Sequence, residues 1–364
     1  MKRFSLLLLI CVGVWASPSR EIVVAIDQNP SKEVPISSSN GCDISKYRPV
    51  SDKNYFFAYG ELFYWKPTQN AVDYAVKGQP SEFFPQQTIG AFRGFGQYGT
   101  VQSASYDWTA GLRVGVGGLF QSRNWELDGN FTYIHPDGSD HVSKPAIDML
   151  IGTHPFDSGN AFLARATTSI DFSYALANLL IVKRILFSED MIFRFFMGST
   201  GGWFDNNWKW KYFSSNNEEN SFVSNWNFSG GGVRGGFQGE WYLCYGFGLG
   251  GTLSTALLYG YYENQYRMKI IAPQNLPPFF KDKSEFGDHR IVPHMQLAFG
   301  PNWGIMINKI VLKLYVQYEL NLLFNLHEVH RSLQEGSIID GRNSRYAYGN
   351  IGLQGLNFGA CLAF

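Results

Sequence analysis

Glycine-rich and histidine-rich stretches are the places in this sequence where residue type and spacing could support chemistry. Residues 94–99 and 230–235 both fit Gly-x-Gly-x-x-Gly, which holds a pyrophosphate when a strand precedes it and a helix follows it. No helical pattern follows either stretch, so we interpret both as glycines within strands. His327-Glu328-Val329-His330 has two histidines three residues apart, whereas zinc proteases need them four apart on a helix. We therefore expect no cofactor, no metal ion and no catalytic residue.

Three other histidines, His135, His141 and His154, fall in one polar segment, where we expect them to be solvated. A hydrolase would need a histidine of this kind beside a serine or an aspartate near the rim of its fold. No partner motif accompanies His135 or His327. Hydrolysis is therefore the function that the sequence favours least, and we expect a protein that is not an enzyme.

Charged and amide residues recur at every second position in segments whose other positions are apolar. After Asn308, the residues Lys313, Gln317 and Glu319 alternate with leucine, valine and tyrosine. Successive side chains of a strand point to opposite faces, so such a segment has one polar and one apolar face. The residues that we expect to line an enclosed lumen are Arg113, Glu126, Asp128, Arg194, Lys313, Gln317 and Glu319. We place Asp171 in the same class, because it is in phase with Ser169 and Ser173.

Two interpretations of these lumen charges stay open. Opposite charges in a narrow passage can set a field that biases which ions cross. Salt bridges could equally brace or fill the lumen. In either case their phase is informative, since an Arg or Lys that faces lipid at mid-membrane costs about 2–4 kcal/mol.

Long strands must position these residues, in either a soluble sandwich or a membrane barrel. The apolar stripes are longer than the average soluble strand of about 5–6 residues. Their ends are aromatic, as at Tyr64, Trp65 and Trp108, which suits the headgroup level of a membrane. Short turns alternate with long polar links, as in outer-membrane barrels. We therefore predict an all-β fold, a transmembrane antiparallel up-and-down β-barrel of about ten to twelve strands.

The expected connections are of two lengths. Short turns are predicted at residues 121–124, 188–190, 244–246 and 307–309. Long links are predicted at residues 66–103, 135–160, 205–224, 263–290 and 325–345. The first long link has room for a further hairpin at residues 88–99.

The start of the chain has the features of a secretory signal peptide. Lys2 and Arg3 precede an apolar stretch at residues 6–14, and Ala16 offers a small-residue cleavage site. We expect a signal peptide at residues 1–16, a polar leader at 17–54 and the barrel at 55–364. After residue 16, no apolar run reaches the 18 residues expected of a spanning helix.

The composition agrees with a lipid-facing protein. Of the 364 residues, Lys and Arg number 30, as do Asp and Glu, so the formal net charge is zero. This balance argues against a nucleic-acid partner, which requires a basic surface. Charged residues make up 16% of the chain, below the roughly 25% of soluble domains.

Three cysteines, Cys42, Cys244 and Cys361, follow the expected signal peptide. All three would lie on the same side of the membrane, in an oxidising compartment where disulfides persist. We expect one disulfide among them, with the pairing left open by their odd number.

The last eight residues resemble the C-terminal assembly signal of outer-membrane barrels, through Asn357, Gly359, Leu362 and Phe364. The resemblance implies recognition by the barrel assembly machinery.

Several segments are also similar to the major-outer-membrane-protein-like family of Legionella and the environmental chlamydiae. They are Tyr-Gly-Glu-Leu-Phe-Tyr-Trp-Lys at residues 59–66, then residues 106–115, 240–243 with 257–260, and 350–364. The likeness covers most of residues 55–364. It implies an abundant outer-membrane barrel with a porin-like or structural role, and it carries no catalytic residue to this chain.

We therefore expect a porin-like protein of a Gram-negative outer membrane that allows passive diffusion of small solutes. The alternative is a structural or adhesive surface barrel that acts through its extracellular loops. The expected partners are the lipid bilayer with lipopolysaccharide, the barrel assembly machinery and small solutes. The sequence leaves open whether several copies associate as a homo-oligomer.

Overall fold

The computed structural model describes ten ranges of the chain. They are residues 55–78, 100–120, 124–144, 149–154, 163–188, 190–214, 219–271, 280–307, 310–332 and 344–364. The expected signal peptide and leader lie outside these residues, and so does the first glycine motif at 94–99. Within the described ranges, no helix is long and apolar enough to cross a membrane.

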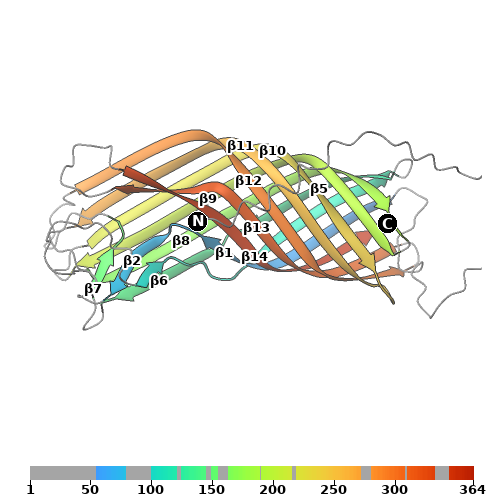
Figure 1. The fold of residues 1–364 in the computed structure, drawn as a ribbon, viewed down its shortest axis with the longest axis horizontal. Coiled ribbons are helices and arrows are strands. Elements are labelled where there is room, and N and C mark those ends of the chain that lie inside the picture. The colour runs from blue at the N-terminus through green and yellow to red at the C-terminus, as the bar shows by residue number, and fades with distance from the viewer. Residues whose placement is uncertain are drawn as a thin grey trace, which may run out of the picture. The chain divides into compact units, whose positions relative to one another are not determined.

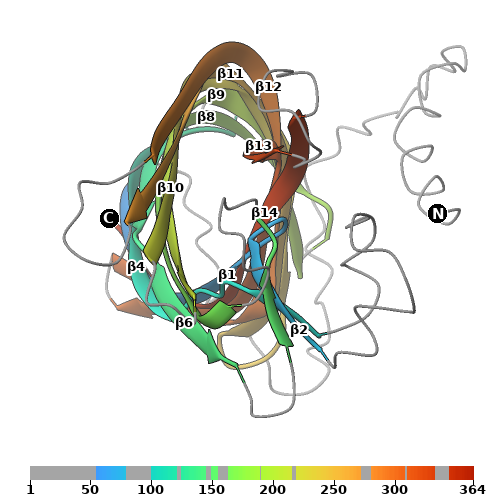
Figure 2. The same ribbon diagram turned by 90° about the vertical axis from the view of Figure 1, so that its left-hand side faces the viewer.

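Ten strands form a closed antiparallel ring (Figures 1 and 2). They are β1 (Tyr55–Gln69), β4 (Thr109–Phe120), β5 (Trp125–Ile134), β8 (Leu163–Leu186), β9 (Met191–Ser214), β10 (Glu219–Tyr242), β11 (Phe247–Ile271), β12 (Phe280–Ile307), β13 (Ile310–Ser332) and β14 (Ser344–Ala363). Each strand pairs with its neighbours in chain order, and β1 also pairs with β14. The predicted all-β barrel is therefore confirmed, at the lower end of the predicted strand number.

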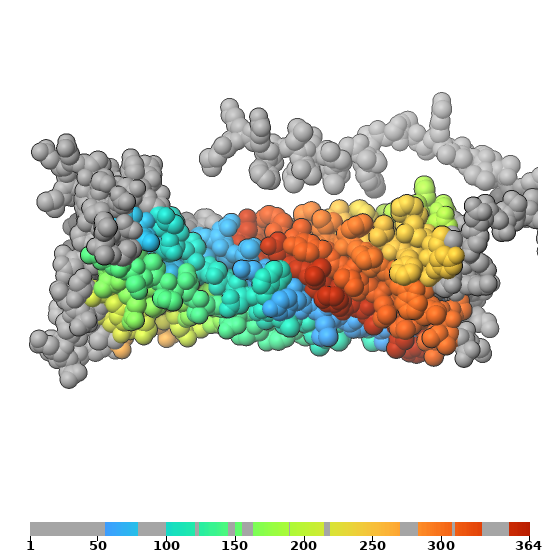
Figure 3. Space-filling view, turned by 90° about the horizontal axis from the view of Figure 1, so that it is seen from below, coloured from blue at the N-terminus to red at the C-terminus, as the bar shows by residue number. Residues whose placement is uncertain are grey.

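Two details explain how the ring closes. The backbones of Phe56 and Phe364 exchange two hydrogen bonds, of 3.0 and 2.9 Å, so the last residue of the chain joins β14 to β1. Figure 3 shows these first and last strands side by side on the wall. Beyond Pro136, β6 (Asp137–Ser143) continues the line of β5 along β8: Ile134 lies opposite Tyr174, and Asp137 opposite Asp171.

The strands from β8 to β13 are far longer than a membrane requires. They run for 23 to 28 residues, whereas about 9–11 residues suffice to cross the bilayer. The long polar links predicted at 205–224, 263–290 and 325–345 are therefore largely wrong, because most of those residues belong to strands. The remaining residues of these three predicted links, at 215–218, 272–279 and 333–343, lie outside the described ranges.

Outward-facing side chains divide the long strands β8 to β12 into an apolar and a polar section. On β9, Phe195, Met197 and Trp203 are exposed hydrophobic residues. Further along the same face, Asp205 and Lys209 are exposed instead. We call the first section the lipid band and the second the extramembrane section. The turn end is the end of the barrel next to the lipid band. Short turns join the strands there, and the barrel chain begins and ends there. The opposite end is the loop end.

Asp171 corrects one prediction about the lumen. It follows the outward phase of Leu179 and Ile181, which are exposed on β8, and it accepts a hydrogen bond of 3.0 Å from Asn207. Its position in the extramembrane section explains why a charge is tolerated on the outer face.

Inside the barrel the polarity is reversed along the same strands. Large aromatic residues fill the interior toward the loop end. The twelve largest fully buried side chains form what we call the aromatic cluster: Phe63, Trp65, Tyr74, Tyr106, Phe172, Tyr174, Phe204, Trp208, Trp210, Tyr212, Trp226 and Tyr262. The extramembrane section is thus built like a soluble protein, with a dry aromatic interior and a wet outer face.

A separate three-stranded sheet lies at the loop end. It contains β3 (Thr100–Ser103), β2 (Asp73–Gly78) and β7 (Met149–Gly152), in that order. The extra hairpin predicted at residues 88–99 falls outside the described residues except at its flank, since β3 begins at Thr100 and pairs with β2. Tyr74 of this sheet belongs to the aromatic cluster and Leu150 is fully buried in the same core, so the sheet packs on the interior of the barrel.

Candidate functional site

A cavity of about 230 Å³ occupies the lumen between the turn end and the aromatic cluster. All seven residues expected to face the lumen line it: Arg113, Glu126, Asp128, Arg194, Lys313, Gln317 and Glu319. They come from β4, β5, β9 and β13, which the alternation of each strand turns toward a common space. The lipid band therefore surrounds a polar interior, as expected for a membrane barrel.

Three further charged residues line the cavity that the sequence pattern did not single out: Glu61, Arg234 and Glu240. Glu61 lies among aromatic residues of β1, and Arg234 lies among the glycines of β10, so the local contrast between faces is weak. The alternation of side chains along β10 could have identified Arg234 and Glu240, because they are an even number of residues apart and therefore point to the same face.

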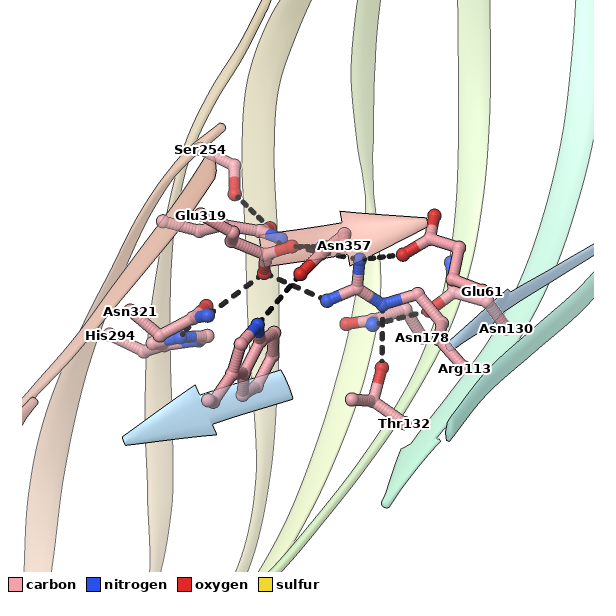
Figure 4. Close-up of polar contacts among 12 residues, drawn as sticks. Glu61, Arg113, Asn130, Thr132, Asn178, Ser254, His294, Glu319, Asn321 and Asn357 are labelled. Atoms are coloured by element: carbon pink, nitrogen blue, oxygen red, sulfur yellow. Dashed lines mark hydrogen bonds and ion pairs between the residues drawn. The ribbon is translucent and has the colours of Figure 1, made fainter. Parts of the chain in front are cut away.

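Glu319 is the centre of the network nearest the aromatic cluster (Figure 4). Its carboxylate is fully buried and forms an ion pair of 2.8 Å with Arg113. The same guanidinium contacts Glu61 at 2.6 Å and donates to Thr132 at 2.9 Å. Three amide side chains also donate to Glu319: Gln296, Asn321 and Asn357. A buried carboxylate with this many donors is compensated for the loss of water.

A second network lies closer to the turn end. Glu240 accepts from Lys313 at 2.7 Å and approaches Arg194 at 3.7 Å. Glu126 contacts Arg184 at 3.1 Å and reaches Arg194 at 4.0 Å. Since β10 and β13 each carry both signs, positive and negative groups are not sorted onto opposite walls. The geometry favours bracing of the lumen over a strong transverse field.

Arg234 is the exception among the lumen cations. It is 5% exposed and donates to neutral oxygens: Asn178 Oδ1 at 3.3 Å, Ser254 Oγ at 2.7 Å, and Gln296 Oε1. Gln296 in turn donates to Glu319 at 2.6 Å. The amide therefore links the Arg234 charge to the Arg113, Glu61 and Glu319 group, which by itself carries one excess negative charge.

The cavity is continuous in structure with the aromatic cluster above it. Tyr174 lines the cavity and stacks on Phe204 with ring centroids 5.2 Å apart. Trp65 Nε1 donates to Asn357 at 2.7 Å, so an assembly-signal residue predicted from the sequence is also part of the lumen network. Movement of the aromatic cluster would therefore displace the charged groups that line the cavity.

His154 corrects the expectation that the histidines of its segment are solvated. It is 1% exposed and packs on Trp210 at a centroid distance of 4.4 Å. Next to it, Tyr212 donates to the Tyr74 carbonyl at 2.6 Å. Burial, together with a hydrogen bond to Asp140, raises the pKa of Tyr74 above its ordinary value. These contacts fix the small sheet to the interior of β9. His135 and His141 are exposed, as expected.

The segment His327–His330 lies in β13, and the prediction that it belongs to an outer loop is wrong. Trp226 Nε1 donates to His327 Nδ1 at 3.0 Å, and Glu328 pairs with Arg290 at 2.8 Å. His135 faces outward while His327 is buried inside, so the wall separates these two hydrolase candidates. Among the residues that the structure describes, no group of three His, Cys, Asp or Glu is arranged to hold a metal. Residues 230–235 lie within β10.

The cysteines have different states. Cys361 is a free thiol that lines the cavity beside Lys313, so it takes no part in the expected disulfide. Cys244, at the turn end, is disulfide-bonded. Cys42 lies outside the described residues.

The remaining assembly-signal residues lie on β14 in two directions. Leu362 and Phe364 are exposed hydrophobic residues of the lipid band. Gly359 faces inward, where a Cβ atom would lie 2.1 Å from the Tyr315 ring. Only glycine leaves room there for Tyr315, whose hydroxyl donates to Glu61 at 2.8 Å.

Comparison with known proteins identifies the kind of barrel. Residues 48–364 match the family described as Legionella pneumophila major outer membrane protein precursor. The chain belongs to this family. As a member of the major outer membrane protein family, the protein resides in the outer membrane, and the resemblance stated from the sequence is confirmed. By the general rule for such barrels, the turn end faces the periplasm and the loop end faces outward.

Solved structures similar to the chain are also outer-membrane proteins. The outer membrane protease OmpT of Escherichia coli shares 12% identity, with 85% of this chain and 96% of that chain covered and a TM-score of 0.39. The toluene transporter TodX of Pseudomonas putida shares 8% identity, with 86% of this chain and 90% of that chain covered and a TM-score of 0.28. A FadL homologue of Pseudomonas aeruginosa shares 8% identity, with 86% of this chain and 90% of that chain covered and a TM-score of 0.23. No curated protein matches the chain in sequence.

Proposed function

We propose that this major outer membrane protein is a narrow, non-enzymatic conduit for small polar solutes. The observation that supports the proposal is the polar cavity inside the lipid band, with charged residues from six strands around about 230 Å³. A lumen that served only to fill the barrel would be stabilised more simply by apolar packing, because burying charges is expensive even when they pair.

The aromatic cluster is the barrier in this proposal. Ten strands are close to the lower limit for a water-filled pore, and the cluster fills the interior toward the loop end. Passage therefore requires the cluster and the small sheet to shift. Two contacts hold the sheet in place. His154 packs on Trp210, and Tyr212 donates a hydrogen bond to the Tyr74 carbonyl.

A structural surface barrel is the second candidate. Its support is the same cluster, seen as a permanent dry core that makes the extramembrane section rigid. The two functions differ in one measurable respect, which is whether current crosses the barrel when the cluster is loosened.

Planar bilayer conductance of the refolded protein tests the proposal. We expect rare, small openings for the native chain. Replacing Trp208 and Trp210 by alanine should increase open time or conductance several-fold, because these rings pack at 4.1 Å from one another at the centre of the barrier. Adding Lys313→Gln should then change ion selectivity, since Lys313 lines the cavity.

A matched control uses Asp205→Asn, which removes a charge from the exposed outer face of the same β9 that carries both tryptophans. That variant should conduct like the native chain. If the double tryptophan variant folds, as judged by heat-modifiable gel mobility, and still carries no current, the conduit is rejected and the structural barrel is favoured.

A further inference from the structure

Basic side chains gather on the outer face of the extramembrane section. We name Lys209, Lys211, Arg267, Lys269 and Lys283 the basic band; all five are exposed. They belong to β9, β11 and β12, and their odd numbers give them the outward phase of Trp203 and Tyr261, which are exposed hydrophobic residues of the lipid band.

Strand register shows that these cations form two adjacent rows. Lys209 lies opposite Val223, which lies opposite Arg267, which lies opposite Lys283. The next row runs from Lys211 through Ser221 to Lys269. Since neighbouring strands are about 4.8 Å apart, long side chains from both rows can reach a single ligand.

The basic band is only partly neutralised by carboxylates. Lys211 pairs with Glu219 at 2.8 Å, and Lys283 pairs with Glu285 at 2.6 Å. Among the described residues, no ion pair is found for Lys209, Arg267 or Lys269. Arg267 lies directly opposite Lys283, and Glu285, which pairs with Lys283, also attracts the Arg267 charge. The five cations of the band therefore share two carboxylates, Glu219 and Glu285, and keep an excess of positive charge that an anion would compensate.

Height above the membrane selects the kind of anion. Lys209 and Arg267 each lie six residues beyond the outward aromatic residues Trp203 and Tyr261. At about 3.3 Å per residue and a tilt near 40°, this places the band roughly 15 Å above the lipid boundary. Two residues above that boundary the outward residues are acidic, Asp205 and Glu263, which do not suit a headgroup phosphate.

We propose that the basic band binds the anionic core saccharide of the outer-leaflet glycolipid, lipopolysaccharide. Phosphate or carboxylate groups on the sugars would lie at the level of Lys209, Arg267 and Lys269, while the acyl chains pack on the lipid band below. Basic clusters next to a membrane recognise anionic lipids through such charge complementarity. The inference is independent of whether the lumen conducts.

Binding of three probes to the refolded protein tests the proposal by native mass spectrometry. The probes are lipopolysaccharide with a complete core, lipid A without core sugars, and inorganic phosphate as a competitor. We expect the complete glycolipid to bind more tightly than lipid A, and millimolar phosphate to leave it bound. In the variant Lys209→Gln/Arg267→Gln/Lys269→Gln, affinity for the complete glycolipid should fall by at least about tenfold, to the level of lipid A.

Single substitutions provide the matched control. Arg267→Gln should weaken binding of the complete glycolipid by several-fold. Lys183→Gln should not, although Lys183 is also an outward cation: it lies near the turn end, with its ammonium 5.0 Å from the centre of the Trp125 ring. Equal binding of lipid A and complete glycolipid, or no loss in the triple variant, would overturn the proposal, and so would displacement by phosphate.

Discussion

At the scale of single residues, the lumen is stabilised by carboxylates that are buried among their partners. Glu319 is 0% exposed and depends on Arg113 and three amides for its solvation. Breaking a buried ion pair is strongly destabilising, because the remaining charge is left uncompensated.

Glu319→Gln tests this stabilisation. We expect the free energy of unfolding to fall by about 3 kcal/mol, the lower end of the usual range for a broken buried pair, because Glu61 still contacts Arg113. Urea unfolding in lipid vesicles, followed by tryptophan fluorescence, measures the change.

Glu219→Gln is the control for this prediction. It makes the same chemical change in the exposed pair with Lys211, where the loss should be about 0.2–1 kcal/mol. Equal losses for the two variants would contradict a stability that depends mainly on the buried network.

Gly359 provides a second prediction at this scale. Gly359→Ala should destabilise the barrel by about 1–3 kcal/mol, the usual cost of overpacking, because the added methyl would overlap the Tyr315 ring. Gly60→Ala is the control on the neighbouring β1, since a methyl group added there would meet no atom within 4 Å. The same unfolding measurement applies, and a harmless Gly359→Ala would show that the interior accommodates a side chain there.

At the scale of the elements, alternation identified the strands wherever the apolar face met lipid. Lys313, Gln317 and Glu319 could be placed on the lumen side because leucine and valine stripes flanked them. The polar composition of residues 205–214 predicts a link, although Trp208, Trp210 and Tyr212 alternate with polar residues there. The prediction is wrong because the polarity of the two faces is reversed in this extension of β9.

Other parts of the site could not be predicted from local pattern. Asn325 has a positive φ of 57°, next to a register shift between Leu323 and His327. This bulge changes the phase of β13 and buries His327 and Glu328. The contact between Arg113 of β4 and Glu319 of β13 depends on closure of the whole ring, which no single strand reveals.

The turn end offers a prediction about the leader. We predict that Cys42 is the partner of Cys244, because Cys361 is free and Cys11 falls within the expected signal peptide. Non-reducing peptide mapping of the mature protein should find Cys42 linked to Cys244 and Cys361 alkylated. A disulfide that contains Cys361 would contradict this.

At the scale of the whole molecule, one β-barrel contains two kinds of interior. Within the lipid band the wall is apolar outside and charged inside. Beyond it the wall is polar outside and aromatic inside. The hydrophobic effect explains both sections, since apolar side chains face whichever neighbour is dry. The conduit, the barrier and the basic band each follow from the place where this reversal occurs.

Nitroxide accessibility along β9 tests the reversal most directly. Single spin labels at Met197, Trp203, Lys209 and Trp210, in protein reconstituted in lipid, are compared for collision with oxygen and with a water-soluble nickel complex. We expect oxygen to dominate at Met197 and Trp203, nickel to dominate at Lys209, and neither to reach Trp210. A nickel-accessible label at Met197, or an oxygen-rich one at Lys209, would contradict the account.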